Sequence, residues 1–404
     1  MFHPSAPARS RTSWLIYLTI LSATGPMSID LYLPSLPEIA HAFSASVGEV
    51  QTTLSIFMIG FAASQLVAGP LSDRFGRRPV IVGGMLLYFV ASVLCRFAPT
   101  IELLIAGRLF QALGACVGPV VARAIVRDLY APDKAVGILA AMGTAMAAAP
   151  ALAPILGGWL LEAFDWRAPF AGMAIFAALL FGATLATLPE TNAHRGAAPI
   201  SPVGIARNFA TLLGHRVFRA YAALLALTFG GIFCFVSGSS FVLIEVLGLA
   251  PADFGYAFAC VVAGLALGST LAGRLARSLR PHEIAGFGVA LLVLSAGTMA
   301  GLAWAGVATV AAILAPMAGF AVGVAMIMPT AMAASIGPFP RIAGSASSLA
   351  GFAQGVTAAS AGWIVAALHD GTTRGFATAL LGFAAAAALA YLSQVRAVSG
   401  AGRS

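Results

Sequence analysis

Charge is what this sequence has least of. Only 9% of its 404 residues are Asp, Glu, Lys or Arg, against about 25% in an average globular domain. Hydrophobic residues make up 60% of the chain, and its mean hydropathy is +0.95. So few charges cannot cover the surface of a water-soluble domain of this length. Disorder is excluded too, because it needs low hydrophobicity. The chain is therefore predicted to use lipid as its solvent.

Residues that bind metals or act as nucleophiles are also scarce. The four cysteines lie within apolar runs and have no paired metal-ligand spacing. The six histidines form no H-E-x-x-H pair, and the chain has no nucleophile elbow. We therefore expect no metal, no cofactor and no enzymatic activity. A ring of charges or a filter-like repeat, which would indicate a passive channel, is missing as well.

Apolar runs long enough to cross a bilayer, about 20 residues each, recur along the whole chain. The first run follows Arg9 and Arg11 but is too long for a signal peptide and has no cleavage site, so it counts as a span. The twelve expected spans are 14–36, 48–69, 79–97, 100–126, 134–160, 167–188, 217–246, 253–275, 283–305, 308–335, 342–368 and 374–395.

The basic residues test this count. If the N-terminus is cytoplasmic, eighteen of the 22 basic residues fall on the cytoplasmic side. Only Arg96, Arg167 and Arg374 fall on the other side, and Arg108 lies within a span. An excess of Lys and Arg in cytoplasmic loops is the rule for membrane proteins. It accounts for the net charge of +8 without a nucleic-acid partner. We expect a multi-pass protein with both termini in the cytoplasm.

A polar stretch divides the spans into two sets of six. Residues 189–216 are rich in proline and arginine and are predicted to be a cytoplasmic linker. The N-terminal half is then 1–188 and the C-terminal half 217–404. Ala68-Gly69 after the second span is repeated 204 residues later as Ala272-Gly273, which supports two parallel repeats. The expected fold is all-α and integral to the membrane, with twelve transmembrane helices in two six-helix halves.

Two ionisable residues lie deep inside the expected spans. Placing a charge there costs free energy, so such a residue is by default taken to have a function. Asp30 is roughly 10 Å below the outer end of the first span at 1.5 Å per residue, and Thr19, Ser22 and Pro26 share its helical face. The stripe indicates a water-accessible cavity. The alternative is an interfacial carboxylate that caps a kinked helix end before Pro34.

Arg108 is about 12 Å deep in the fourth span, with Gln111 on the same face. The similar depths allow Asp30 and Arg108 to face one cavity. The alternative is a structural arginine that donates to backbone carbonyls.

Two motifs combine charge, glycine and proline. The loop after the second span contains Gly69, Asp73, Arg74, Gly76, Arg77 and Arg78. We expect Gly69 to allow a close helix approach, Gly76 a turn with φ > 0, and Asp73 to sit at a helix N-terminus. Asp128 is the expected partner of the arginines, in a latch that breaks as the protein changes conformation. The fifth span carries Pro150, Pro154, Gly157 and Gly158, which favour a kink and close packing at a moving interface.

Together these motifs resemble the major facilitator superfamily, and in particular its twelve-helix drug/proton antiporters. The loop from Gly69 to Arg78 is similar to the signature between helices 2 and 3, Arg108 with Gln111 to the helix-4 motif, and Pro150 to Gly158 to the helix-5 antiporter motif. Ala153 stands where the family usually has Gly. Three further stretches resemble the bicyclomycin/chloramphenicol-resistance (Bcr/CflA) branch, and they are 30–37, 123–128 and 235–242.

The resemblance implies alternating access and export of small amphiphilic drugs across the inner membrane in exchange for protons. It makes Asp30 the candidate proton-coupling carboxylate and Arg108 its modulator. A second helix-1 acid found in some relatives is replaced here by Ser22. A proton-coupled exporter of a natural metabolite, such as an amino acid or sugar, is the alternative. The expected partners are small-molecule drugs, protons and the bilayer, and we expect a monomer.

Aromatic and Met side chains suit a loose, promiscuous pocket. By position, the candidates for the substrate cavity are Met27, Tyr32, Phe57, Met58, Gln111, Phe233 and Phe235.

Overall fold

In the computed structural model, which describes residues 11–192 and 202–395, the chain folds into helices without any strand in those ranges. The first half consists of α1 (Arg11–Ser22), α2 (Thr24–Asp30), α3 (Leu36–Phe43), α4 (Val47–Phe75), α5 (Arg77–Arg96), α6 (Ile101–Leu129), α7 (Pro132–Met146), α8 (Ala149–Ala163) and α9 (Ala168–Thr187). A 3₁₀ turn, η1 (Leu33–Ser35), joins α2 to α3.

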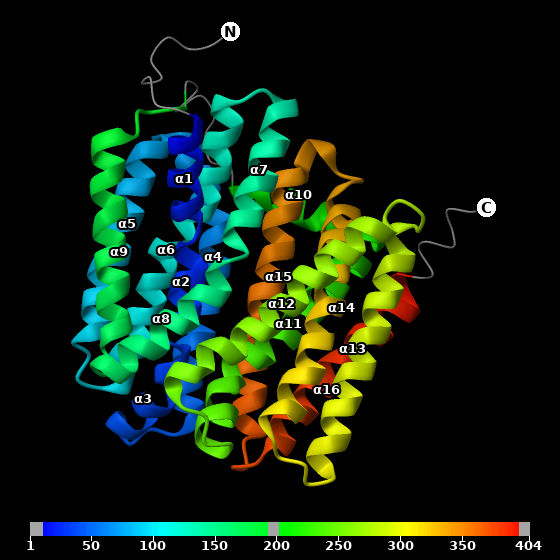
Figure 1. Cartoon of the computed structure of the whole chain (residues 1–404). Coiled ribbons are helices and arrows are strands. Elements are labelled where there is room, and N and C mark those ends of the chain that lie inside the picture. The colour runs from blue at the N-terminus through cyan, green and yellow to red at the C-terminus, as the bar shows by residue number, and fades with distance from the viewer. Residues whose placement is uncertain (1–10, 193–201, 396–404) are drawn as a thin grey trace.

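The second half follows α10 (Pro202–Gly214). It consists of α11 (Arg216–Ser240), α12 (Pro251–Leu275), α13 (Pro281–Trp304), α14 (Val310–Ile336), α15 (Ala343–Ala367) and α16 (Thr373–Ala390). The π-helical segments η2 (Phe241–Val246) and η4 (Tyr391–Val395) extend α11 and α16, and the 3₁₀ turn η3 (Pro340–Ile342) precedes α15. Figure 1 shows the two halves side by side.

Eleven helices in the described ranges are long and apolar enough to cross a membrane. A twelfth span results if the bent pair at the N-terminus counts as one. The expected first span, 14–36, is thus broken into segments that meet at 43°. Pro26 accounts for this bend at Ala23, because proline removes a backbone donor and blocks the preceding turn. Pro34 and Pro37 lie further along, in η1 and at the start of α3. The spans match the expected count and lie within a few residues of the expected boundaries.

The predicted linker contains a helix that its polar composition did not indicate. In α10, Phe209 and Leu212 pack near the start of α15 in a small cluster with Phe218 and Ala346. Residues 193–201 lie outside the described ranges. We call the end of the bundle with α10 and the start of α1 the linker face, and the end with α3 the far face (Figure 1).

The halves meet through α4 against α15 and through α8 against α12. On the far face, Ser55 donates to the carbonyl of Ala359 at 3.0 Å, and Trp363 donates to Thr52 at 3.2 Å. His41 of α3 lies 3.3 Å from Glu245 of η2. The far face is therefore closed by direct contacts between the halves.

Candidate functional site: a cavity between the two halves

The centre of the molecule holds a cavity of about 420 Å³. Both halves build its wall, with α2, α4 and α8 on one side and α11, α12, α14 and α15 on the other. The wall is almost entirely apolar, and the polar side chains on it are Asp30, Gln65 and Gln354. A space of this size and character suits a small amphiphilic molecule.

Of the residues that the structure describes, Asp30 is the one ionisable residue on the cavity wall. It ends α2 and lines the cavity, and Leu31 and Tyr32 lead from it to η1. The residue is 5% exposed. Among the described residues, the structure gives Asp30 neither an ion-pair partner nor a side-chain hydrogen bond. Burial without a compensating charge disfavours the ionised form of a carboxyl group unless water or a ligand reaches it.

Arg108 lies inside the first half rather than on the cavity wall. Its side chain is fully buried, donates from Nη2 to the carbonyl of Ser28 at 2.9 Å and from Nη1 to Gln111. Its guanidinium carbon lies 4.2 Å from the centre of the Tyr32 ring and 4.4 Å from that of Phe57. These cation–π contacts and hydrogen bonds stabilise its charge without an acid, while its buried Nε has no hydrogen-bond partner among the described residues.

Asp30 and Arg108 therefore form no ion pair in this conformation. The structure matches the alternative in which the arginine donates to a backbone carbonyl. Arg108 nevertheless holds the carbonyl two residues before Asp30, so it braces the segment that carries the acid.

The cavity includes only part of the predicted substrate set. Met58, Phe233 and Phe235 line it. Met27 packs against the core, and Tyr32, Phe57 and Gln111 enclose Arg108, so these four lie outside the wall. The prediction chose these residues by their depth in the membrane and did not consider which side of each helix faces the cavity.

Sequence reasoning missed several aromatic residues on the wall. Phe61 lies three residues after Met58, and Phe229 lies four before Phe233. Residues at these spacings share a helical face. The helical periodicity around Met58 and Phe233 could therefore have predicted that Phe61 and Phe229 also line the cavity.

The loop between α4 and α5 is organised by Arg77. Its Nε donates to Asp128 at 2.8 Å, its Nη1 donates to Ser72 at 2.8 Å and also to Asp73, and the residue is 7% exposed. Gly76 has φ of +102°, a conformation that favours glycine. Of the three arginines expected to pair with acids here, only Arg77 does so among the described residues.

Two expectations for this loop are wrong. Asp73 lies in the last turn of α4, not at a helix N-terminus, and it is tolerated there because Arg77 neutralises it. The carboxylate at the start of α5 belongs to Glu190, which accepts from the backbone N–H of Arg77 at 2.9 Å. Gly69 allows no close helix approach, since a Cβ there would meet nothing within 4 Å among the described atoms.

Replacing Arg77 tests the importance of this network. Arg77→Ala leaves Asp73 and Asp128 without their shared cation, and hydrogen bonds to charged groups contribute about 2 kcal/mol each. We expect a clear drop in the melting temperature of the detergent-solubilised protein. Arg74→Ala is the matched control, because Arg74 is exposed and contacts only the ring of Phe75 among the described residues. Equal melting temperatures for the two variants would contradict a structural role for Arg77.

The fifth-span motif lies at two close contacts. Pro150 stands at the start of α8, where α7 gives way to a new helix, and Pro154 lies inside α8. A Cβ on Gly157 would collide with the carbonyl oxygen of Leu31, and one on Gly158 with that of Pro251 in the other half. Gly157 thus allows packing against the Asp30 segment, and Gly158 allows the far face to close.

Comparison with known proteins gives consistent matches over most of the chain. The family model described as Major Facilitator Superfamily matches residues 18–362. Multidrug resistance protein D of Escherichia coli (strain K12) is 30% identical over 347 residues, which are 85% of each chain. The bicyclomycin resistance protein homolog of Haemophilus influenzae is 29% identical over 374 residues, which are 90% of this chain and 91% of the relative.

Solved structures of transporters share the fold. A peptide transporter POT in complex with sulfate aligns with a TM-score of 0.76 and 15% identity, over 99% of this chain and 97% of its own. A D-xylose-proton symporter aligns with a TM-score of 0.73 and 16% identity, over 94% and 96%. At these identities the likeness concerns the fold alone.

Proposed function

Because the chain belongs to the Major Facilitator Superfamily, we propose that it exports small amphiphilic drugs in exchange for protons. It is a multi-pass membrane transporter, not an enzyme. The single observation that carries the proposal is Asp30, which is the one ionisable group that the described residues place on the wall of an apolar cavity between the two halves. The names of two relatives, a multidrug resistance protein and a bicyclomycin resistance protein homolog, support drugs as the substrate class.

Asp30 couples the two fluxes in this proposal. When the cavity is open to the low-proton side, Asp30 releases its proton and the drug binds in its place. When the cavity opens to the other side, water reaches Asp30, a proton binds and the drug leaves. Arg108 keeps the Asp30 segment in place through Ser28. Tyr32, Phe57 and Gln111 position Arg108, while Met58, Phe233 and Phe235 contact the drug.

The conformational elements follow from the same scheme. The loop of Gly69, Asp73, Arg74, Gly76, Arg77, Arg78 with Asp128 ties α4, α5 and α6 together in the described conformation and breaks when the protein changes conformation. Pro150, Pro154, Gly157 and Gly158 form the moving contact at the far face. With the linker face in the cytoplasm, as the distribution of basic residues supports, the described state is closed to the outside. The protein then functions as a monomer in the bacterial inner membrane.

The proton gradient supplies enough energy for this exchange. One elementary charge crossing the membrane potential yields about 2.3 kcal/mol per 100 mV. Since about 1.4 kcal/mol corresponds to a factor of ten, one proton per drug sustains roughly a fiftyfold gradient of a neutral drug.

A drug-susceptibility panel in a pump-deficient bacterial strain tests the proposal. Expression of the wild-type chain should raise the inhibitory concentration several-fold for some small amphiphilic drugs, within the roughly fiftyfold limit set by one proton. Expression of Asp30→Asn at the same level should not. An unchanged panel for the wild-type chain would contradict drug export and favour the metabolite exporter.

A further inference from the structure

A second pocket, of about 380 Å³, lies on the linker face. We call it the linker-face pocket. It lies between α4 and α6 of the first half and α10 and α15 of the second. Gln65 lines both this pocket and the central cavity. Gln65 therefore lies between the two spaces, where its side chain reaches Gly351 of the second half. The linker-face pocket thus adjoins the central cavity on this side, and we take it as the mouth through which a ligand reaches the cavity.

Arg123 and Arg127 give this mouth positive charge that no acid among the described side chains balances. The ionisable residues lining the pocket are these two arginines together with Asp73, Arg77 and Asp128. Both acids are bonded to Arg77. Within the described parts of the chain, neither Arg123 nor Arg127 has an ion-pair partner.

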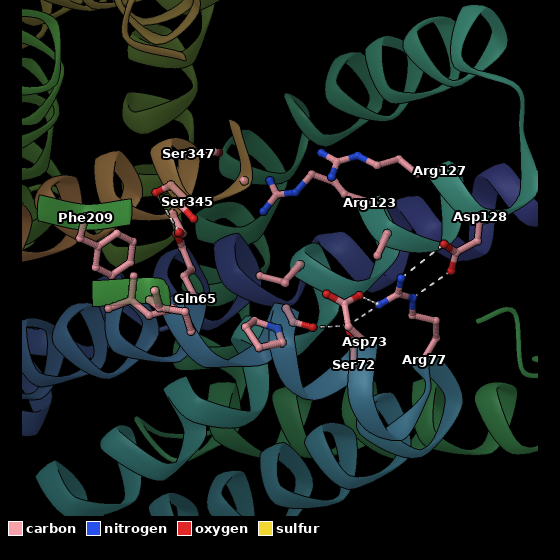
Figure 2. A pocket seen from close by; sticks show the side chains of 18 residues that line it. Gln65, Ser72, Asp73, Arg77, Arg123, Arg127, Asp128, Phe209, Ser345 and Ser347 are labelled. Atoms are coloured by element: carbon pink, nitrogen blue, oxygen red, sulfur yellow. Dashed lines mark hydrogen bonds and ion pairs between the residues drawn. The ribbon is translucent and has the colours of Figure 1, made fainter. Parts of the chain in front are cut away.

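The orientation of the side chains agrees with this charge distribution. In Figure 2, Arg77 is turned towards Asp73 and Asp128. Arg123 points from α6 across the pocket towards Ser345 and Ser347 instead. A ligand moving from the linker face to Gln65 therefore passes an uncompensated guanidinium group.

The opposite wall adds potential of the same sign. α15 begins at Ala343, no side chain caps its start, and its first turns line the pocket through Ser345 and Ser347. The N-terminus of a helix carries about half a positive charge. No acid lines this wall of the pocket, so the dipole reinforces the field of the two arginines.

We propose that Arg123 and Arg127 form an electrostatic filter at the mouth of the cavity, which admits neutral and anionic amphiphiles more readily than permanent cations. The filter specifies which charge class of drug the proposed exporter would admit, and this inference rests on the proposed drug export. A unit charge about 10 Å away changes the local concentration of a monovalent ion by about twofold in water and by more than tenfold at an effective dielectric constant of 20. Salt weakens the effect, because the Debye length is about 10 Å at 0.1 M.

Transport into inside-out vesicles tests the filter. The probes are tetraphenylphosphonium, a permanent cation, and chloramphenicol, a neutral amphiphile. The ratio of their initial rates is compared between the wild-type chain and the double variant Arg123→Gln with Arg127→Gln. We expect this cation-to-neutral ratio to rise by about three- to tenfold at low salt, and by much less at 0.5 M salt.

Two controls separate the filter from a general disturbance. Arg207→Gln removes an exposed charge on α10 that does not line the pocket, and it should leave the ratio unchanged. Arg123→Lys with Arg127→Lys keeps the charge and should also keep the wild-type ratio. A double Gln variant that transports chloramphenicol with an unchanged ratio would overturn the proposal.

A second measurement does not depend on drug transport. All four cysteines are replaced, and Met328→Cys places a single thiol on the cavity wall. Cationic and anionic methanethiosulfonate reagents are then added to inside-out vesicles. The filter predicts that the double Gln variant raises the cationic-to-anionic rate ratio by about ten- to a hundredfold, the square of the change against a neutral probe, and an unchanged ratio contradicts it. If the wild-type chain transports neither drug probe, the proposed export fails, yet this ratio still decides whether the filter exists.

Discussion

Asp30→Asn is expected to abolish proton-driven export while the protein still inserts and folds. Asparagine keeps the size and polarity of the side chain but cannot release a proton at any physiological pH. Because Asp30 is the only ionisable residue on the cavity wall in the described ranges of the chain, no neighbouring described group on that wall can replace it. The drug gradient sustained by a pH difference should fall from as much as tenfold per pH unit, the limit for one proton per neutral drug, to none.

Proteoliposomes with an imposed pH gradient provide the measurement. Asp253→Asn is the matched control, because Asp253 is an exposed acid in the first turn of α12 and does not line the cavity. It should export at the wild-type rate. Export driven by the pH gradient at the wild-type rate in Asp30→Asn would contradict the role assigned to Asp30.

The second large effect is expected from Gly255→Leu, a substitution that places a bulky side chain between the two halves and that we call the wedge variant. A Cβ on Gly255 of α12 would collide with the backbone of Ile155 in α8. Backbone cannot move aside as a flexible side chain does, and overpacking of this kind costs about 1–3 kcal/mol or more. Gly255→Leu should therefore disfavour the closed far face by about tenfold to a hundredfold and reduce transport to below roughly a tenth.

A cysteine reporter shows which face is open. Gln51 of α4 is 1% exposed in the closed state, and neither polar atom of its amide has a hydrogen-bond partner in the described structure. In a background without native cysteines, Gln51→Cys should be protected from an impermeant thiol reagent added at the far face. Gly255→Leu should expose it. Gly273→Leu, on the same helix but in open space, should leave the reporter protected and transport intact.

High reactivity of the Gln51→Cys thiol in the presence of Gly255→Leu would also result if the substitution misfolded the protein, because misfolding exposes a buried residue. The melting temperature of the purified variant separates these cases. A folded wedge variant with a protected reporter would contradict the contact of α8 with α12 as the far-face closure.

The architecture was predictable because it depends on quantities that are local in the sequence. Spans follow from runs of about 20 apolar residues, and the positions of α4 to α9 and α11 to α16 agree with those runs within a few residues. Asp30 was found for the same reason, since a single charge inside an apolar run is conspicuous. The break between α1 and α2 and the helix α10 were missed. The apolar run does not show where a span bends, and a short amphipathic helix contains no apolar run of about 20 residues.

The parts that sequence reasoning missed depend on contacts between distant segments. Arg108 turns to Ser28, 80 residues away, and depth in the membrane says nothing about this direction. Glu190 caps α5 from a position 113 residues later in the chain, so the loop motif alone pointed to Asp73. The aromatic residues on the cavity wall follow from how the faces of α4 and α11 are turned, which only the packing of the halves decides.

The central claim is that drug and proton move in opposite directions through one carboxyl group, and proton flux measures it most directly. Inside-out vesicles are acidified, a pH-sensitive dye reports the gradient, and a drug identified by the susceptibility panel is added. The wild-type chain should dissipate the gradient on drug addition, and Asp253→Asn should do the same. Asp30→Asn should leave the gradient unchanged. Equal drug-induced proton release by the wild-type chain and by Asp30→Asn would contradict the mechanism.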